Sequence, residues 1–333
     1  MNILVIGGAG YIGSHMVQRL LDTGYRVVIL DNLSSGHIDA LAGGEFVHGD
    51  LANRALLDAV FSTHRFDCVF HFACHSLVGD SIRDPALYYS NNLSSTINLL
   101  QAMSRHKARH LVLASSAAIF GESCAMFIDE RHPIQPTNPY GRSIWMIEQM
   151  LADFDGAYGI KSTALRYFNV AGVHPSGKLG ERHTPETHLI PRLLQAVTGR
   201  LSRIEIYGRD YGTPDGTPVR DYIHVMDICE ANLLAMRRLL SGGKTGAYNI
   251  GSSQGASVLE VVAAVERITG KRLTIHQGVR RLGDPSRVVA NAELARTDLA
   301  WRCRYSLNTI IEDAWRWEKG EQEMLDYYTA ARV

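Results

Sequence analysis

The sequence predicts an α/β fold in which a doubly wound parallel sheet is followed by a smaller C-terminal α/β domain. Short apolar runs alternate with helical patterns over the first half of the chain, a glycine-rich turn follows the first run, and the pattern changes after about residue 170. Strands that alternate with helices favour a parallel sheet covered on both faces. A chain of 333 residues is also long for one compact core, which favours two closely joined domains.

The individual elements follow from the spacing of apolar residues. Residues 2–6 are short, rich in branched side chains and bounded by glycines, which is typical of a buried parallel strand. Apolar residues then recur at helical spacing over 14–22. The same criteria predict strands at 26–30, 68–72, 110–114 and 162–166, and helices at 91–103, 140–151 and 258–268.

The second half of the chain has more loop-like sequence. Residues 173–187 are rich in Gly, Pro and charge, and residues 208–218 hold four residues typical of turns, so both are predicted to be loops. We expect a first domain at 1–170 and a second domain mostly at 171–333, with the chain re-entering the first near 221–240.

Composition excludes several function classes. Lys plus Arg equals Asp plus Glu, 34 each, so net charge favours neither nucleic acid nor an anionic membrane as partner. We see no signal peptide and no apolar run near the roughly 20 residues that span a bilayer, and we expect a cytoplasmic protein. The cysteines are odd in number, lack metal-ligand spacing and are expected to be reduced, mostly buried thiols, with no metal site: Cys68, Cys74, Cys124, Cys229 and Cys303.

A dinucleotide site is predicted where the first strand meets the first helix. Gly7, Gly10 and Gly13 allow a tight turn, close approach of a pyrophosphate and packing of the helix on the sheet. The helix N-terminus supplies free N–H groups for the phosphates. Asp31 closes the second strand, where a carboxylate binds the adenosine ribose and repels a 2′-phosphate, which favours NAD over NADP. Asp50 follows the third expected strand, and its spacing leaves open whether it contacts adenine.

Hydroxyl side chains mark a candidate catalytic site. Ser115 and Ser116 follow a buried strand, and ligands gather at the carboxyl ends of strands in α/β sheets. Tyr140 begins the next helix after Pro139. A Ser hydroxyl and a Tyr phenol can together hold a sugar hydroxyl and carry its proton.

A series of motifs extends this pattern over nearly the whole chain. They are GGAGYIGSH (7–15), LDNLSSG (30–36), GDL (49–51), HFACHSLVGDSIRDPALYYSNN (71–92), SSAAIFGE (115–122), NPYGRS (138–143), LRYFNVAG (165–172), HLIP (188–191), YGRDYGTPDGTPVRDYIHVMD (207–227) and YNIG (248–251). In this order and spacing the chain resembles the extended short-chain dehydrogenase/reductase family and, within it, the UDP-glucose 4-epimerases.

The resemblance implies a Rossmann domain with NAD as cofactor, and a UDP-sugar as substrate. Ser116 and Tyr140 would be catalytic. Besides the three glycines, NAD would be held by Tyr11, Ile12, Asp31, Asn32, Asp50, Leu51, Phe72, Ala73, Asn91 and Phe168. The substrate would be held by Tyr167, Asn169, Leu189, Tyr207, Arg220, Arg281 and Asp284.

The implied reaction is a transient oxidation of the hexose at C4. Tyr140 takes the proton of the 4-hydroxyl while a hydride leaves C4; the 4-keto sugar then presents its other face and the hydride returns. NAD stays bound throughout, because its release would strand the intermediate. The resemblance also implies a homodimer formed through helices near 91–104 and 141–152.

The chain departs from this family at the residue that follows Tyr140 by one helical turn. The family has a Lys there that binds the nicotinamide ribose and lowers the pKa of the Tyr, and this chain has Ile144. Arg142 is only two residues from Tyr140 and is expected to face away from it. Ser76 stands where some members have a second NAD-contacting Lys, and His75 beside it is interpreted as a packing residue.

Three alternatives remain open. Ile144 is consistent with a catalytically weak or inactive NAD and nucleotide-sugar binding protein. Val288 is small at a position that limits the room beside the sugar, which favours UDP-N-acetylhexosamines as substrates. A 4,6-dehydratase is disfavoured, because Ala117 and Ala118 stand where such enzymes have an acidic pair.

Overall fold

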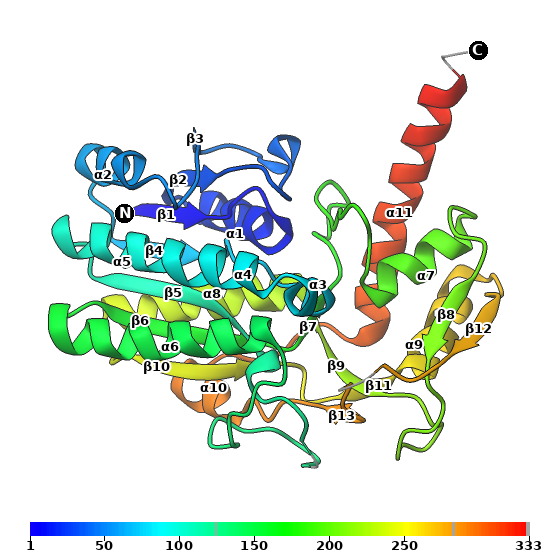
Figure 1. The fold of residues 1–333 in the computed structure, drawn as a ribbon. Coiled ribbons are helices and arrows are strands. Elements are labelled where there is room, and N and C mark those ends of the chain that lie inside the picture. The colour runs from blue at the N-terminus through cyan, green and yellow to red at the C-terminus, as the bar shows by residue number, and fades with distance from the viewer. Residues whose placement is uncertain (124, 282–283, 331–333) are drawn as a thin grey trace.

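The computed structural model describes residues 1–330 apart from 124 and 282–283, with the side chains of 322–330 also outside that description (Figure 1). Cys124 therefore lies outside the described residues, and the other four cysteines are free thiols. Among the described residues, no helix combines the length and apolar character needed to cross a membrane.

A seven-stranded sheet forms the larger part of the molecule. Its order is β3-β2-β1-β4-β5-β6-β10, and every neighbouring pair is parallel. The order reverses direction between β1 and β4, which is the switch point where such sheets bind ligands. The strands are β1 (Asn2–Ile6), β2 (Arg26–Asp31), β3 (Glu45–His48), β4 (Cys68–His71), β5 (His110–Ser116), β6 (Lys161–Tyr167) and β10 (Gly246–Ile250).

Helices cover both faces of this sheet (Figure 1). One face packs on α2 (Arg54–Thr63), α5 (Ser95–Arg105) and α6 (Pro139–Tyr158), and the other on α1 (Tyr11–Asp22) and α8 (Val225–Leu240). Successive side chains of a strand point to opposite faces, so the buried residues of β1 that follow Asn2 must be apolar on both faces. Its Leu4 and Ile6 belong to the first of these cores, and its Ile3 and Val5 to the second.

A smaller region packs beside the carboxyl ends of the strands. It has its own apolar core between α7, α9 and α11. Ser257 and Glu260 form a capping box that starts α9. Its elements are β7 (Asn169–Ala171), α7 (Leu189–Val197), β8 (Ile204–Tyr207), β9 (Val219–His224), β11 (Gly255–Ser257), α9 (Val258–Thr269), β12 (Ile275–Gly278), β13 (Arg287–Val288) and α11 (Leu307–Ala330).

Short helical elements complete the fold. They are the 3-10 turns η1 (Ile38–Ala40) and η3 (Ala117–Ile119), the helices α3 (Val78–Arg83), α4 (Pro85–Tyr88) and α10 (Glu293–Asp298), and the π-helical η2 (Tyr89–Ser94).

The expected re-entry of the chain near 221–240 corresponds to α8, which packs on β5, β6 and α1. The chain then adds β10 to the sheet beside β6. The preceding strand β9 pairs instead with β7, β11 and β13 in the smaller region. We propose that the first domain comprises residues 1–168 together with α8 and β10, because β7, which begins at Asn169 and not after the predicted boundary at 170, pairs with β9 of the smaller region.

Candidate active site

The turn between β1 and α1 is built so that only glycine fits at two positions. Gly7 has φ +75°, and a Cβ there would lie 2.7 Å from the backbone N of Ala73. A Cβ on Gly13 would lie 2.0 Å from the carbonyl oxygen of Gly7. Gly10 is the N-cap of α1 and has no side chain to satisfy the first N–H groups of the helix. The turn therefore brings open backbone donors to the switch point of the sheet, as a pyrophosphate requires.

A cleft opens beside this turn. It lies at the carboxyl ends of β1, β2 and β4. The predicted cofactor residues that line it are Gly7, Gly10, Asp31, Asn32, Asp50, Leu51, Phe72, Ala73 and Asn91. The glycine turn, the carboxylate at the end of β2 and the apolar wall fit a dinucleotide such as NAD.

Two carboxylates shape one end of the cleft. Asp31 accepts hydrogen bonds from the backbone N of Ala9 and of Leu33, each at 2.8 Å, so its carboxylate is fixed at the end of β2. Asp50 accepts from the Asn32 amide at 2.6 Å. Each carboxylate oxygen has more than one lone pair, so Asp31 can still accept hydrogen bonds from ribose hydroxyls.

The side chains of Tyr11 and Ile12 point away from the cleft. The Tyr11 hydroxyl donates to the carbonyl of Gly172 in the smaller region. Burial, followed by the nearby Glu181, raises the pKa of Tyr11 well above its usual value. Ile12 packs in the core beside α1. A cofactor contact from either residue would come from the backbone at the start of α1.

Tyr140 and Ser116 meet beside this cleft. Tyr140 is the second residue of α6, whose N-cap Asn138 accepts a hydrogen bond from Gly141 N at 2.9 Å. Burial raises the pKa of Tyr140 to about 12, and a hydrogen bond with the Ser116 hydroxyl opposes that shift. Cys74, which lines the cleft, is also among the neighbours of the Tyr140 phenol.

Ser115, by contrast, has a structural role. It donates to Glu148 at 2.5 Å, and Glu148 forms a buried salt bridge with Arg166. Because side chains alternate along β5, Ser115 points toward Glu148 in the packed interior and Ser116 points toward Tyr140.

Ile144 is fully buried in the core beneath α6. It lies one turn after Tyr140, where its apolar side chain cannot stabilise a phenolate. In the part of the chain that the structure describes, the groups that shift the pKa of Tyr140 are Ser116, Cys74 and Tyr88, and none is a cation. Arg142 is exposed, as its spacing predicts.

A polar network that the sequence pattern does not reveal holds the start of α6. The amide of Asn92 donates to the carbonyl of His75 at 3.1 Å and to the hydroxyl of Ser143 at 3.0 Å. Ser143 in turn donates to the carbonyl of Tyr140 at 2.8 Å, and Asn92 accepts from His75 N at 2.8 Å. His75 thus contributes its backbone to this network, which fixes the cleft wall relative to Tyr140.

The predicted diphosphate residues gather on β8, β9 and the segment before β13. Arg220 pairs with Asp284 and donates to the carbonyl of Pro285 at 2.8 Å. The guanidinium of Arg281 lies 4.0 Å from the ring centre of Tyr207. Both arginines retain N–H groups for an anion.

The other predicted substrate residues are dispersed. Leu189 is the first residue of α7 and is half-buried, and Asn169 is exposed at the start of β7. Phe168, which was predicted to contact the cofactor, lies in the core of the first domain. Tyr167 faces the opposite side of the sheet, where its hydroxyl bonds to Asn232 of α8 at 3.0 Å. Its side chain does not reach the site, because strand alternation directs Arg166 toward α6 and Tyr167 toward α8.

Val288 pairs with Arg220 across β13 and β9. Its small, half-buried side chain therefore lies beside an arginine of the predicted diphosphate site.

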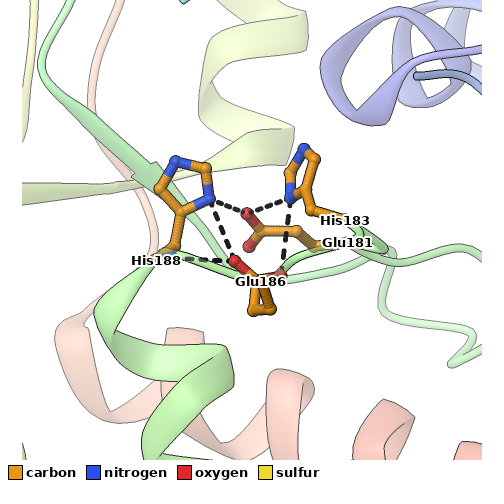
Figure 2. A group of neighbouring side chains, drawn as sticks. All are labelled: Glu181, His183, Glu186 and His188. Atoms are coloured by element: carbon orange, nitrogen blue, oxygen red, sulfur yellow. Dashed lines mark hydrogen bonds and ion pairs between the residues drawn. The ribbon is translucent and has the colours of Figure 1, made fainter. Parts of the chain in front are cut away.

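The loop between β7 and α7 holds a further set of polar residues that the sequence pattern assigns no role. Glu181, His183, Glu186 and His188 converge close to Tyr11 (Figure 2).

Comparison with known proteins agrees with this arrangement. A model of the NAD dependent epimerase/dehydratase family matches residues 3–251. A UDP-glucose 4-epimerase from Halalkalibacterium halodurans is 47% identical over 320 residues, which is 96% of each chain. The structure of a UDP-glucose 4-epimerase from Brucella ovis in complex with NAD is 44% identical, with a TM-score of 0.92 over 94% of this chain and 97% of that one. One from Bifidobacterium longum, in complex with NAD+ and UDP, is 35% identical, with a TM-score of 0.92 over 97% and 99% of the two chains.

Proposed function

Because the chain belongs to the NAD dependent epimerase/dehydratase family, we propose that it is a UDP-hexose 4-epimerase that interconverts UDP-galactose and UDP-glucose with tightly bound NAD. The proximity of the Ser116 hydroxyl and the Tyr140 phenol beside the dinucleotide cleft carries this proposal. The similarity of the whole chain to relatives with this activity supports it.

In this proposal NAD, when bound, supplies the hydride acceptor and donor. Gly7, Gly10 and Asp31 hold its pyrophosphate and ribose at the cleft. Tyr140 takes the proton of the sugar 4-hydroxyl and later returns it, while Ser116 holds that hydroxyl in place.

Arg220 and Arg281 would bind the diphosphate of UDP. A guanidinium grips a diphosphate with two parallel N–H···O bonds, and Arg220 is already oriented by Asp284. Holding the substrate by its diphosphate leaves the hexose free to turn, so either face of C4 can be presented to the same catalytic residues.

A second substrate class is supported by Val288. Its small side chain beside Arg220 leaves room for an N-acetyl group, so UDP-N-acetylhexosamines are candidate substrates for the same chemistry.

We also propose that the chain forms a homodimer through α5 and α6. These helices cover the same face of the sheet (Figure 1). Met146 on α6 is 41% exposed. Burial of such a side chain against a second copy is favourable.

The function is tested by turnover of UDP-galactose, with the UDP-glucose formed separated chromatographically. We expect slow conversion by the unaltered protein, faster conversion by Ile144→Lys, and none by Tyr140→Phe. Turnover by Ile144→Lys alone would identify an epimerase scaffold whose base is disabled. If neither the unaltered protein nor Ile144→Lys turned over UDP-galactose while NAD was bound, UDP-galactose would not be the substrate. UDP-N-acetylgalactosamine, assayed in parallel, would show whether the N-acetyl sugar is the substrate.

A further inference from the structure

Four ligand-type side chains converge in the loop between β7 and α7. We call Glu181, His183, Glu186 and His188 the His–Glu cluster. Each offers one nitrogen or oxygen atom, and these four atoms all lie within 4.8 Å of one another. Figure 2 shows the two imidazoles facing each other with both carboxylates between them.

The separations of these atoms are suitable for binding one shared metal ion. The His183 Nδ1 atom lies 3.3 Å from Glu181 and 3.4 Å from Glu186, and His188 Nδ1 lies 3.4 Å from Glu186. Donor atoms about 2.0–2.1 Å from a tetrahedral ion are about 3.3 Å apart. His188 and Glu181 are closer, at 2.5 Å, and would have to separate slightly around an ion.

The imidazole–carboxylate contacts of Glu181 with His183 and His188 are close ion-pair contacts that lack the alignment of hydrogen bonds. The Oε1 atom of Glu181 and the Nδ1 atom of His183 are both buried and have no hydrogen-bond partner. The Glu181 side chain is only 3% exposed, so bulk water does not hydrogen-bond to its carboxylate. A buried carboxylate oxygen that has ion-pair neighbours but no aligned hydrogen bond is costly, and this oxygen points into the cluster rather than out of it.

The surrounding structure fixes the cluster in place. Glu186 accepts hydrogen bonds from the backbone N of Thr187 at 2.7 Å and of His188 at 2.8 Å, immediately before α7. The Tyr11 ring packs edge-on against His183, with ring centres 6.3 Å apart. His188 is half exposed, which leaves an approach from solvent.

We propose that the His–Glu cluster binds one divalent transition-metal ion of the Zn²⁺ type. Two imidazoles and two carboxylates are a donor set that Zn²⁺ and its neighbours accept, whereas Mg²⁺ and Ca²⁺ prefer oxygen alone. The two carboxylates balance the charge of the ion. The ion would cross-link the loop 181–188 through His188, which is the N-cap of α7. This structural role is independent of the proposed epimerase activity.

The competing explanation is a network of protonated imidazoles paired with the carboxylates. Such a network binds no metal, so metal binding separates the two. Full-length protein treated with a chelator is titrated with Co²⁺ while the visible absorption is recorded, and Zn²⁺ is then added as competitor. We expect one Co²⁺ per chain, displacement by Zn²⁺, and a higher melting temperature with Zn²⁺.

Variants locate the ion. Glu181→Gln and His183→Gln should weaken Co²⁺ binding by roughly 10- to 100-fold or more. His64→Gln is the matched control, because His64 also pairs with a glutamate, Glu45 at 3.1 Å, but lies at the C-terminal end of α2, outside the His–Glu cluster. Binding in His64→Gln should be unchanged.

Absence of stoichiometric Co²⁺ and Zn²⁺ binding by the unaltered protein would overturn the proposal. Equal binding by the unaltered protein and both cluster variants would also overturn it. The titration of the unaltered protein does not depend on the variants, and Glu186→Gln serves as a third variant if another fails to fold.

Discussion

Tyr140, the proposed catalytic base, has surroundings that disfavour its ionised form. Burial raises its pKa to about 12, and the residue one turn later is the apolar Ile144. A phenol whose pKa lies near 12 holds only about 0.01% phenolate at pH 8. The positive charge of the oxidised nicotinamide would favour the phenolate, so activity is expected to be reduced rather than lost.

The first prediction concerns the pH dependence of turnover. If Tyr140 acts as the base in its deprotonated form, as proposed, its raised pKa means that the kcat of the unaltered protein should still be rising with pH above pH 9. Ile144→Lys places a cation beside the phenol, lowers its pKa and should move the rising limb of the profile to lower pH by at least about one unit.

Ile144→Met is the control for that experiment, because it keeps an apolar side chain of similar volume and adds no charge. Its profile should match that of the unaltered protein. Equal profiles for Ile144→Lys and Ile144→Met would show that residue 144 does not act on the Tyr140 base.

Asp221 connects separate elements of the smaller region. From β9 it accepts hydrogen bonds from Ser252 N at 2.7 Å, Ser253 N at 3.0 Å and Ala290 N at 3.1 Å. Burial raises its pKa to about 6, but all these partners are donors, and donors favour the ionised carboxylate.

The second prediction follows from that geometry. Asp221→Asn turns one oxygen into an NH₂ group that faces backbone donors, and should lower the free energy of unfolding by about 2–4 kcal/mol. Asp153→Asn, at an exposed position on α6, should change it by less than about 0.5 kcal/mol. Denaturant melts of both variants provide the comparison, and equal stability would show that the Asp221 contacts contribute nothing.

Several elements were predictable because their sequence pattern has one explanation. The strand at 2–6 is confirmed as β1 with the same bounds, and 258–268 lies within α9. The expected loops at 173–187 and 208–218 contain no helix or strand. Other bounds differ from the prediction. The helix predicted to end at 151 continues to Tyr158, and the first residues of the helix predicted at 91–103 adopt the π-helical η2.

The candidate site was predictable where a motif fixes backbone geometry. The three glycines and Asp31 lie where their spacing places them. Tyr167 was less predictable, because a motif does not state which face of a strand a side chain occupies. The network of Asn92 and Ser143 and the His–Glu cluster depend on packing between segments, which local spacing does not reveal.

For the whole molecule, the third prediction is its assembly state. Light scattering should give twice the mass of one chain, and Met146→Asp should shift the molecule to monomers, because it places a charge in the proposed contact between α5 and α6. Met126→Asp is the control: Met126 is more exposed, at 68%, but lies in the loop beside Arg287 rather than on α6. A monomeric unaltered protein would contradict the proposed dimer.

The position of β10 has a consequence for how this protein is made. β10 begins at Gly246, yet it pairs with β6, which ends at Tyr167, and α8 covers part of the same sheet. A ribosome therefore releases most of the sheet well before the strand that completes it. During that interval the nascent chain presents the unpaired edge of β6 and an uncovered apolar face, surfaces that chaperones bind and that promote aggregation. Chains truncated before Val225 retain both surfaces and should be removed by proteolysis, whereas chains that end between α8 and β10 retain only the unpaired edge of β6.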